Sequence, residues 1–323
     1  MRIPPGESPL VSDRTASNPL DSTFLGCRFR TPLIAAAGTC GYIEELPGVL
    51  DPHELGAITT KSITVEPREG NPPWRLIDLP GAMLNAIGLA NVGLTRFLEE
   101  KLPHAATVET TIIGSIAGHS IDEYVAVAAA FDREERLPLV ELNVSCPNTS
   151  DGLQFGEHPD KLRELLKEVR PALSRTKLIV KLSPNVGSIV DMAQAAVEGG
   201  ADALTLINTV AAMAIDVETR APRLSRGQGG LSGPAIHPIA VRMVRDVYDR
   251  VARDANVPII GLGGVLKWQD AAEFILAGAS AVGIGTGLFV DPVLPRSINR
   301  GLSGWVTRQG CHSFTELIGQ VGG

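Results

Sequence analysis

The chain has 323 residues, a formal net charge of −7 and a hydrophobic content of 44%. This length supports a large core, and an acidic chain without a basic stripe argues against nucleic acid as a main partner. The four cysteines form no CxxC motif, so we interpret them as reduced thiols of a cytoplasmic protein and expect no metal site.

No secretory or membrane-spanning segment is predicted. The first 13 residues lack the apolar stretch of a secretory signal peptide. The longest uncharged run covers residues 274–290, and four glycines interrupt it. These 17 residues reach only the lower limit for a membrane span, so we interpret the run as a helix end, a strand and a turn.

Strand and helix patterns alternate after a polar, proline-bearing tail at residues 1–21. Eight strands are predicted, over residues 32–38, 56–62, 110–116, 139–145, 177–183, 203–209, 258–264 and 281–286. Helices are predicted over residues 120–131, 158–173, 234–254 and 269–278, the first with Ser120 as its N-cap. This alternation indicates an α/β fold, a single (β/α)8 TIM barrel over residues 22–323, with an open doubly wound sheet as the alternative.

Two connections, residues 63–92 and 210–233, are too long to be simple loops. A barrel would place these insertions at the C-terminal face of the strands, where barrel enzymes build their active sites. Polar or reactive residues also lie at several strand ends, namely Thr39, Cys40, Lys61, Asn143, Cys146, Lys181, Asn208 and Thr209. Each has an ordinary structural explanation alone, but a barrel would gather all of them on one rim.

Two glycine-rich strand ends, GLGG at 261–264 and GIGTG at 283–287, each precede a helical segment. Glycine lets backbone N–H groups approach a phosphate, and phosphate sites after barrel strands 7 and 8 recur in this fold. Ordinary tight turns are the alternative. No GxGxxG motif follows the first strand, so a Rossmann dinucleotide site is not supported.

Two further motifs point to chemistry. NVSCPN at 143–148 places Cys146 after a strand and before a proline, where a cationic neighbour such as Lys61 or Lys181 could make the thiol an acid or base. A buried, unreactive thiol is the alternative. NAIGLAN at 85–91 could present carboxamides and backbone donors to a flat, polar, heterocyclic anion, or it could simply cap its own turns.

These motifs resemble the dihydroorotate dehydrogenase family, class 1, from about residue 25 to residue 319. The matching segments include TTKSITVEPREGNP (59–72), MLNAIGLAN (83–91), ELNVSCPNTSDGLQFGEHP (141–159) and PIIGLGGVLKWQDAAEFILAGASAVGIGT (258–286). The resemblance implies a barrel with one FMN per chain that oxidises (S)-dihydroorotate to orotate in de novo pyrimidine (UMP) biosynthesis.

The resemblance also assigns residues to roles. Cys146 matches the catalytic base that removes the C5 proton while a hydride passes from C6 to flavin N5, and Lys61 matches a lysine between flavin and substrate. The substrate positions are Lys61, Asn85, Gly88, Leu89, Asn143, Asn148, Asn208 and Thr209. The cofactor positions are Ala37, Gly38, Lys61, Asn143, Lys181, Gly233, Gly263, Gly264, Gly285 and Thr286.

Within the family, Cys146 is typical of class 1, because the membrane-associated class 2 uses serine. FGEHP and AIDVETRAP resemble class 1B, which works with a second subunit holding FAD and a [2Fe–2S] cluster and passes electrons to NAD. A homodimer of this chain is also implied. Ala37, Ala212 and His237 depart from the usual family pattern.

The alternatives are a fumarate-linked class 1A enzyme, a dihydropyrimidine (uracil or thymine) dehydrogenase of the flavin-barrel type, and a barrel that has lost its flavin.

Overall fold

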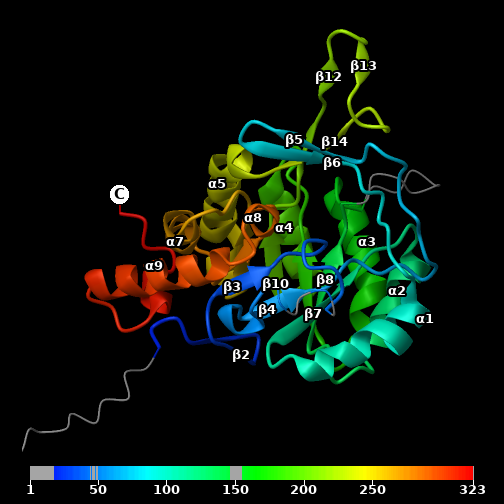
Figure 1. The fold of residues 1–323 in the computed structure, drawn as a ribbon. Helices are drawn as coiled ribbons and strands as arrows, with labels where there is room; N and C mark the ends of the chain where they lie inside the picture. The colour runs from blue at the N-terminus through cyan, green and yellow to red at the C-terminus, as the bar shows by residue number, and fades with distance from the viewer. Residues whose placement is uncertain (1–17, 44, 46–47, 49, 146–154, 323) are drawn as a thin grey trace, which may run out of the picture.

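A computed structural model describes residues 18–43, 45, 48, 50–145 and 155–322. Eight parallel strands close a barrel in chain order, and helices surround it (Figure 1). The strands are β3 (Leu33–Ala35), β4 (Ala57–Thr59), β7 (Thr111–Ile116), β8 (Leu139–Asn143), β9 (Lys177–Lys181), β10 (Ala203–Leu206), β15 (Ile259–Leu262) and β16 (Ala281–Ile284). Each lies within a predicted strand, so the (β/α)8 barrel is confirmed and the open sheet is wrong.

A helix is present at each of the four predicted ranges, but other helices, among them Ile189–Glu198 and Leu294–Arg308, were not predicted. The α-helices are α1 (Leu94–Arg96), α2 (Ile121–Phe131), α3 (Pro159–Val169), α4 (Ile189–Glu198), α5 (His237–Val247), α6 (Arg253–Ala255), α7 (Trp268–Ala277), α8 (Gly287–Val290) and α9 (Leu294–Arg308). Shorter 3-10 or π-helical segments are Pro52–Glu54, Phe97–Lys101, Leu102–Thr107, Arg170–Ala172, Pro234–Ile236, Tyr248–Ala252 and Phe314–Leu317. The Ser120 side chain caps α2 by accepting a hydrogen bond from Glu123 N, as predicted.

The uncharged run at 274–290 contains the end of α7, then β16, then α8 where a turn was expected. Within the described residues, no helix combines the length and the hydropathy that a membrane span requires. Residues 1–17 of the predicted tail lie outside the description, and the single-domain boundary at residue 22 stays a prediction.

The interior of the barrel is apolar away from the C-terminal ends of the strands. Each barrel strand contributes one residue to a buried cluster, and these residues are Ile34, Ala57, Ile113, Leu139, Ile179, Ala203, Ile260 and Ala281. A hairpin of β1 (Ser22–Phe24) and β2 (Cys27–Phe29) adds Phe24 and Phe29, whose stacked rings lie 5.2 Å apart. This hairpin was not predicted, and it covers the cluster before the chain enters the barrel.

The interior becomes polar toward the C-terminal ends of the strands. Five buried residues there, each 8% exposed or less, carry hydroxyl, carboxylate or ammonium groups: Thr59, Ser115, Glu141, Lys181 and Thr205. Buried polar groups need partners, so this change marks the end of the barrel that is built for chemistry.

The two long insertions combine into one sheet above the barrel (Figure 1). It contains β5 (Leu76–Leu79), β6 (Ala82–Asn85), β11 (Val210–Ala212) and β14 (Gly229–Ser232), in the order β11-β14-β6-β5. β14 pairs antiparallel with β6, so Gly230 lies opposite Asn85. A second hairpin, β12 (Ile215–Asp216) and β13 (Ala221–Pro222), projects outward from this sheet.

Candidate active site

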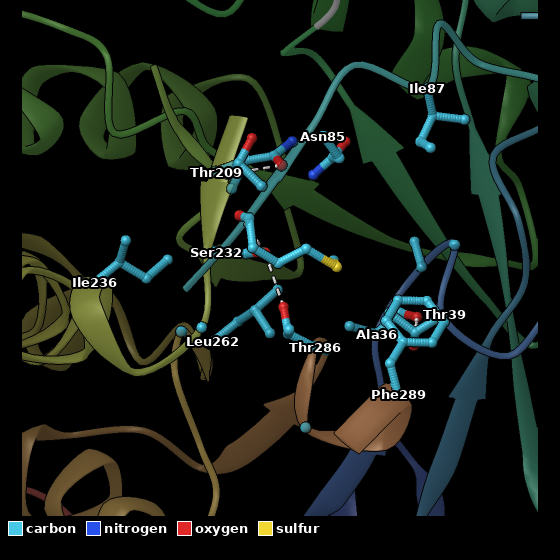
Figure 2. Close-up of a pocket in the computed structure, with 18 of the residues that line it drawn as sticks. Ala36, Thr39, Asn85, Ile87, Thr209, Ser232, Ile236, Leu262, Thr286 and Phe289 are labelled. Carbon is cyan, nitrogen blue, oxygen red and sulfur yellow. Dashed lines mark hydrogen bonds between the residues drawn. The ribbon is translucent and has the colours of Figure 1, made fainter. Parts of the chain in front are cut away.

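A cavity of about 350 Å³ lies between the barrel rim and the insertion sheet (Figure 2). It falls within the roughly 300–1,000 Å³ typical of ligand sites. Fourteen predicted site residues line it, namely Ala37, Gly38, Lys61, Asn85, Leu89, Asn143, Lys181, Asn208, Thr209, Gly233, Gly263, Gly264, Gly285 and Thr286. Gly88 does not line it, and the predicted residues Cys146 and Asn148 lie outside the described residues. The structure therefore places most of the predicted site residues around one cavity.

The NAIGLAN segment divides into cavity-facing and structural residues. Asn85 and Leu89 line the cavity. Gly88 has a φ of +76°, and a Cβ there would lie 2.7 Å from the Asn71 side chain, so close packing explains this glycine. Asn91 is buried, and its Nδ2 donates to Thr64 Oγ1 at 2.9 Å. Its Nδ2 also donates to Leu89 O at 2.8 Å and its Oδ1 accepts from Gly93 N at 2.8 Å, so for Asn91 the alternative that the segment caps its own turns is correct.

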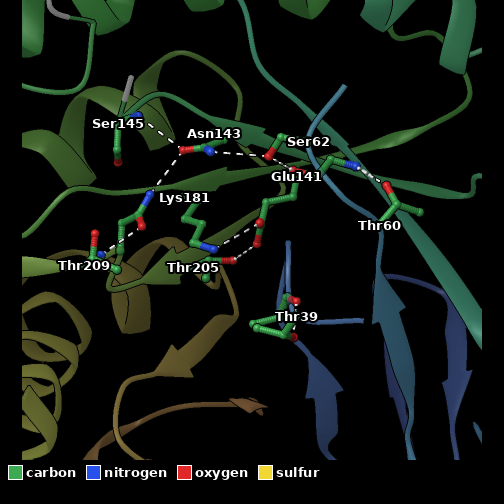
Figure 3. A network of polar contacts seen from close by, with 12 residues as sticks. Thr39, Thr60, Ser62, Glu141, Asn143, Ser145, Lys181, Thr205 and Thr209 are labelled. Atoms are coloured by element: carbon green, nitrogen blue, oxygen red, sulfur yellow. Dashed lines mark hydrogen bonds and ion pairs between the residues drawn. The ribbon is translucent and has the colours of Figure 1, made fainter. Parts of the chain in front are cut away.

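Asn143, at the end of β8, is the centre of a polar network (Figure 3). Its Oδ1 accepts hydrogen bonds from Asn208 Nδ2 at 3.1 Å and Ser145 N at 3.4 Å. Its Nδ2 donates to Ser62 Oγ at 3.3 Å, and Ser62 Oγ lies 2.8 Å from Ser115 Oγ. These contacts fix which way the amide of Asn143 faces, and they present the barrel's polar edge to the cavity.

Besides Lys181, two cationic side chains of the described residues line the cavity, Lys61 after β4 and Arg75 just before β5. Partial burial lowers the pKa of Lys61, and the positive charge of Arg75 lowers it further, while Glu45 opposes the effect. Arg75 Nη1 also donates to the backbone oxygens of Glu69 and Asn71, at 3.0 and 3.2 Å. Arg75 was not among the predicted site residues. It reaches the cavity only because the insertion at residues 63–92 folds back over the barrel, and no local sequence pattern indicates this path.

Lys181, which lines the cavity, belongs to a buried ion pair with Glu141, which does not line it. Lys181 Nζ lies 3.5 Å from Glu141 Oε1, and Thr205 Oγ1 donates to Glu141 Oε2 at 2.9 Å (Figure 3). The Lys181 and Glu141 side chains are only 7% and 4% exposed. Glu141 was missed as a site residue, although its place two residues before Asn143 on the same strand gives it the same inward face.

The two glycine-rich turns form a cradle of backbone donors. Gly264 has a φ of +69°, and a Cβ there would lie 2.7 Å from Gly233 O, so only glycine fits this turn. Among the described residues, the N–H groups of Gly264 and Thr286 donate to no protein acceptor. Thr286 Oγ1 donates to Ser232 Oγ at 2.8 Å, which ties the turn after β16 to the insertion sheet. Free N–H groups at such turns suit a phosphate.

Cys40 follows Thr39 near this rim but is not a reactive group. Burial raises the pKa of its thiol to about 11, a hydrogen bond with Thr39 lowers it in part, and the Glu45 charge raises it. The thiol is therefore neutral at physiological pH. In the described part of the chain, no group of three or more His, Cys, Asp or Glu side chains is arranged to hold a metal ion.

Comparisons with known proteins agree with this geometry. The sequence model of a family described as "Dihydroorotate dehydrogenase" matches residues 19–305. The chain is 45% identical over 297 residues to the catalytic subunit of dihydroorotate dehydrogenase B (NAD(+)) from Geotalea uraniireducens, covering 92% of this chain and 96% of that protein. It is 44% identical over 295 residues to the catalytic subunit of the same name from Bacteroides thetaiotaomicron, covering 91% and 96%.

Solved structures support the fold. A ligand-free DHODH from Eimeria tenella superimposes with a TM-score of 0.79 at 23% identity, over 95% of this chain and 92% of that one. Its complex with ferulenol gives a TM-score of 0.78 at 24% identity, over 95% and 89%. The resemblance found in the motifs is confirmed over most of the chain, which belongs to the dihydroorotate dehydrogenase family of oxidoreductases.

Proposed function

We propose that this chain is the catalytic subunit of a class 1B enzyme that oxidises (S)-dihydroorotate to orotate with FMN. The observation that carries the proposal is the rim cavity. There the Asn143 network, the Lys61 and Arg75 cations and a cradle of N–H groups without an acceptor among the described residues meet beside Lys181, which pairs with Glu141. The relatives at 44–45% identity are themselves named catalytic subunits of dihydroorotate dehydrogenase B (NAD(+)).

The residues present fit FMN. The phosphate would lie at the cradle of Gly264 and Thr286, where the N–H groups have no acceptor in the described part of the chain and a Cβ would obstruct the Gly264 turn. Ala37, Gly38 and Lys181 line the part of the cavity that would hold the flavin ring, with Lys181 as the cation near it. When bound, FMN accepts the electrons that leave the substrate.

A second group of cavity residues, Asn143, Asn208 and Lys61, suits a planar anion as substrate. Asn143 and Asn208 have their amides fixed by each other and by Ser62, so their free edges can recognise ring N–H and carbonyl groups. Lys61 supplies positive charge for the carboxylate of the substrate. A dihydropyrimidine dehydrogenase would act on rings that lack this carboxylate, so Lys61 with Arg75 at the cavity favours dihydroorotate over uracil or thymine.

Cys146 is proposed as the base that takes the C5 proton. It follows Ser145 directly in the sequence, and Ser145 N donates to Asn143 Oδ1 at the end of β8. The support for this role is the NVSCPN motif and the family resemblance. The chain's own residues thus bind and orient the ring, while the deprotonated thiolate of Cys146 receives one proton and becomes a thiol.

An electron-transfer partner completes the proposal. The relatives are named catalytic subunits of an NAD(+) enzyme, which favours a second subunit that holds FAD and a [2Fe–2S] cluster and reduces NAD. A homodimer of this chain is part of the same proposal. Turnover with NAD only when the partner is co-purified would support class 1B. Turnover of this chain alone with fumarate would instead establish class 1A.

The direct test of cofactor and substrate uses the purified full chain. Denaturation should release about one FMN per chain, and anaerobic dihydroorotate should bleach the flavin absorbance. Dihydrouracil serves as the matched substrate without a carboxylate, and it should leave the flavin oxidised. A colourless protein would contradict the cofactor assignment, and equal bleaching by dihydrouracil would contradict the substrate assignment.

A further inference from the structure

Glu141 is a buried carboxylate to which the proposed reaction gives no role. It lies on β8 with its side chain inside the barrel, one inward position below Asn143. Strand β9 pairs with β8 so that Lys181 lies opposite Asn143, one inward position closer to the rim than Glu141, and Lys181 lines the cavity whereas Glu141 does not. Glu141 is therefore one step farther from the rim than the cation with which it pairs.

The contacts of this carboxylate are few and specific. Oε2 accepts a hydrogen bond from Thr205 across the barrel at 2.9 Å. Oε1 accepts no hydrogen bond within the described residues, and its cation is Lys181 at 3.5 Å. Replacing such a buried pair with apolar residues is often neutral or stabilising, so stability alone does not explain why the pair is present. The geometry instead suggests an electrostatic role.

We propose that Glu141 is a positioning residue that partly neutralises Lys181 and thereby lowers the reduction potential of the bound flavin. The inference rests on the proposed function, because it requires FMN beside Lys181. A flavin gains negative charge when it is reduced, and the Lys181 cation favours that state. The negative charge of Glu141 opposes this stabilisation of the reduced flavin. Charges interact strongly in the barrel interior because its effective dielectric constant is lower than that of water. A lower potential makes it easier for electrons to leave for an acceptor.

The test is the midpoint potential of the bound flavin in Glu141→Gln, measured by equilibration with redox dyes at one pH. Glutamine keeps the shape and an acceptor for Thr205 but removes the charge. The ratio of reduced to oxidised flavin at a fixed ambient potential should rise on the order of tenfold, about 30 mV for a two-electron couple. Glu141→Asp keeps the charge and should stay close to the wild-type potential.

A second comparison guards against an unstable single variant. Lys181→Gln should lower the potential, and Lys181→Gln/Glu141→Gln should raise it again relative to Lys181→Gln alone. An unchanged or lower potential on removal of the Glu141 charge, in either background, would overturn the inference.

FMN content and bleaching of the wild type are measured first. If the wild type carries no flavin, the proposed function itself fails. If it carries flavin that dihydroorotate reduces and the potentials do not move as stated, only the role of Glu141 fails.

Discussion

Asn208 Nδ2 donates a hydrogen bond to Asn143 Oδ1 at 3.1 Å, across 65 residues of sequence. The contact joins the residue that ends β8 to a residue that follows β10, and it leaves the two amides with defined orientations. Asn208 Oδ1 in turn accepts from Thr209 N at 2.8 Å. In a carboxamide, orientation decides which edge donates and which accepts, so this contact prepares the cavity for one pattern of ring substituents.

The orientation of Asn143 should depend on Ser62. Ser62→Ala removes the acceptor for Asn143 Nδ2, so the amide is free to turn and the bound ring loses alignment. We expect KM for dihydroorotate to rise roughly 3- to 10-fold, the effect of one modest hydrogen bond, with FMN content unchanged. Ser297→Ala is the matched control, because that hydroxyl donates to Leu294 O within α9. Equal KM values for Ser62→Ala and Ser297→Ala would contradict the role of Ser62.

The charge of Arg75 should control the pH dependence of substrate binding through Lys61. Burial first, and then Arg75, lower the pKa of Lys61. Lysine is charged below its pKa, so attraction of the anionic substrate is lost as pH rises through that value. Arg75→Gln should raise the pKa of Lys61 and move the basic limb of kcat/KM to higher pH. Arg75→Lys keeps the charge and should leave the limb in place. A limb that moves to lower pH in Arg75→Gln would contradict this account.

The glycine cradle predicts a specific loss of cofactor. Gly264→Ala would place a Cβ 2.7 Å from Gly233 O at a φ of +69°, so the turn must shift. Gly310→Ala is matched in backbone strain, with a φ of +73°, but its Cβ would meet nothing within 4 Å. Backbone strain should cost each variant about 1 kcal/mol of stability, and the clash with Gly233 O adds to that cost in Gly264→Ala. Only Gly264→Ala should release FMN on dilution, measured by flavin fluorescence, and similar retention in both would argue against the cradle.

Asp132 should contribute acid-sensitive stability. Partial burial raises the pKa of its carboxyl, but hydrogen bonds from the Ser174 hydroxyl and from the backbone N–H groups of Thr176, Arg175 and Ser174 outweigh burial, and the pKa lies well below its ordinary value. A depressed pKa adds stability above the unfolded-state pKa of about 3.9, and that stability is lost as pH falls below it. Asp132→Asn should therefore be less stable than wild type at pH 7, by about 1–2 kcal/mol.

Urea unfolding at pH 7 and at about pH 3 tests this contribution, since the two pH values bracket the unfolded-state pKa. The difference between wild type and Asp132→Asn should shrink at the lower pH. A difference that stays constant would show that the Asp132 charge does not provide the stability.

The barrel could be predicted because its strands are short β-branched or alanine-rich runs, buried on both faces, at regular spacing. The insertion sheet could not. Its central pairing joins β6 with β14, which are far apart in the sequence, and the GGLS residues of β14 have little strand propensity. The β1–β2 hairpin was missed for a similar reason, since its strands have only three residues each.

The site could be predicted where polar residues stand at strand ends, although each of these residues alone has an ordinary structural explanation. Lys61, Asn143 and Lys181 stand at strand ends, which a barrel gathers on one face. Glu141 and Arg75 were missed because their placement depends on tertiary contacts. Glu141 accepts a hydrogen bond from Thr205 across the barrel, and Arg75 donates to the backbone of its own curved insertion. Gly88 matched a substrate position by resemblance, but it lies outside the cavity lining because its place is fixed by packing against Asn71.

The rate of anaerobic flavin reduction by dihydroorotate in Cys146→Ala tests the central claim most directly. A general base contributes roughly 10²- to 10⁴-fold, so bleaching should slow by that factor while orotate still perturbs the flavin spectrum. Cys311→Ala, at a half-buried cysteine beyond α9, should bleach at the wild-type rate. A Cys146→Ala protein that retains FMN, binds orotate and is reduced as fast as wild type would contradict the account.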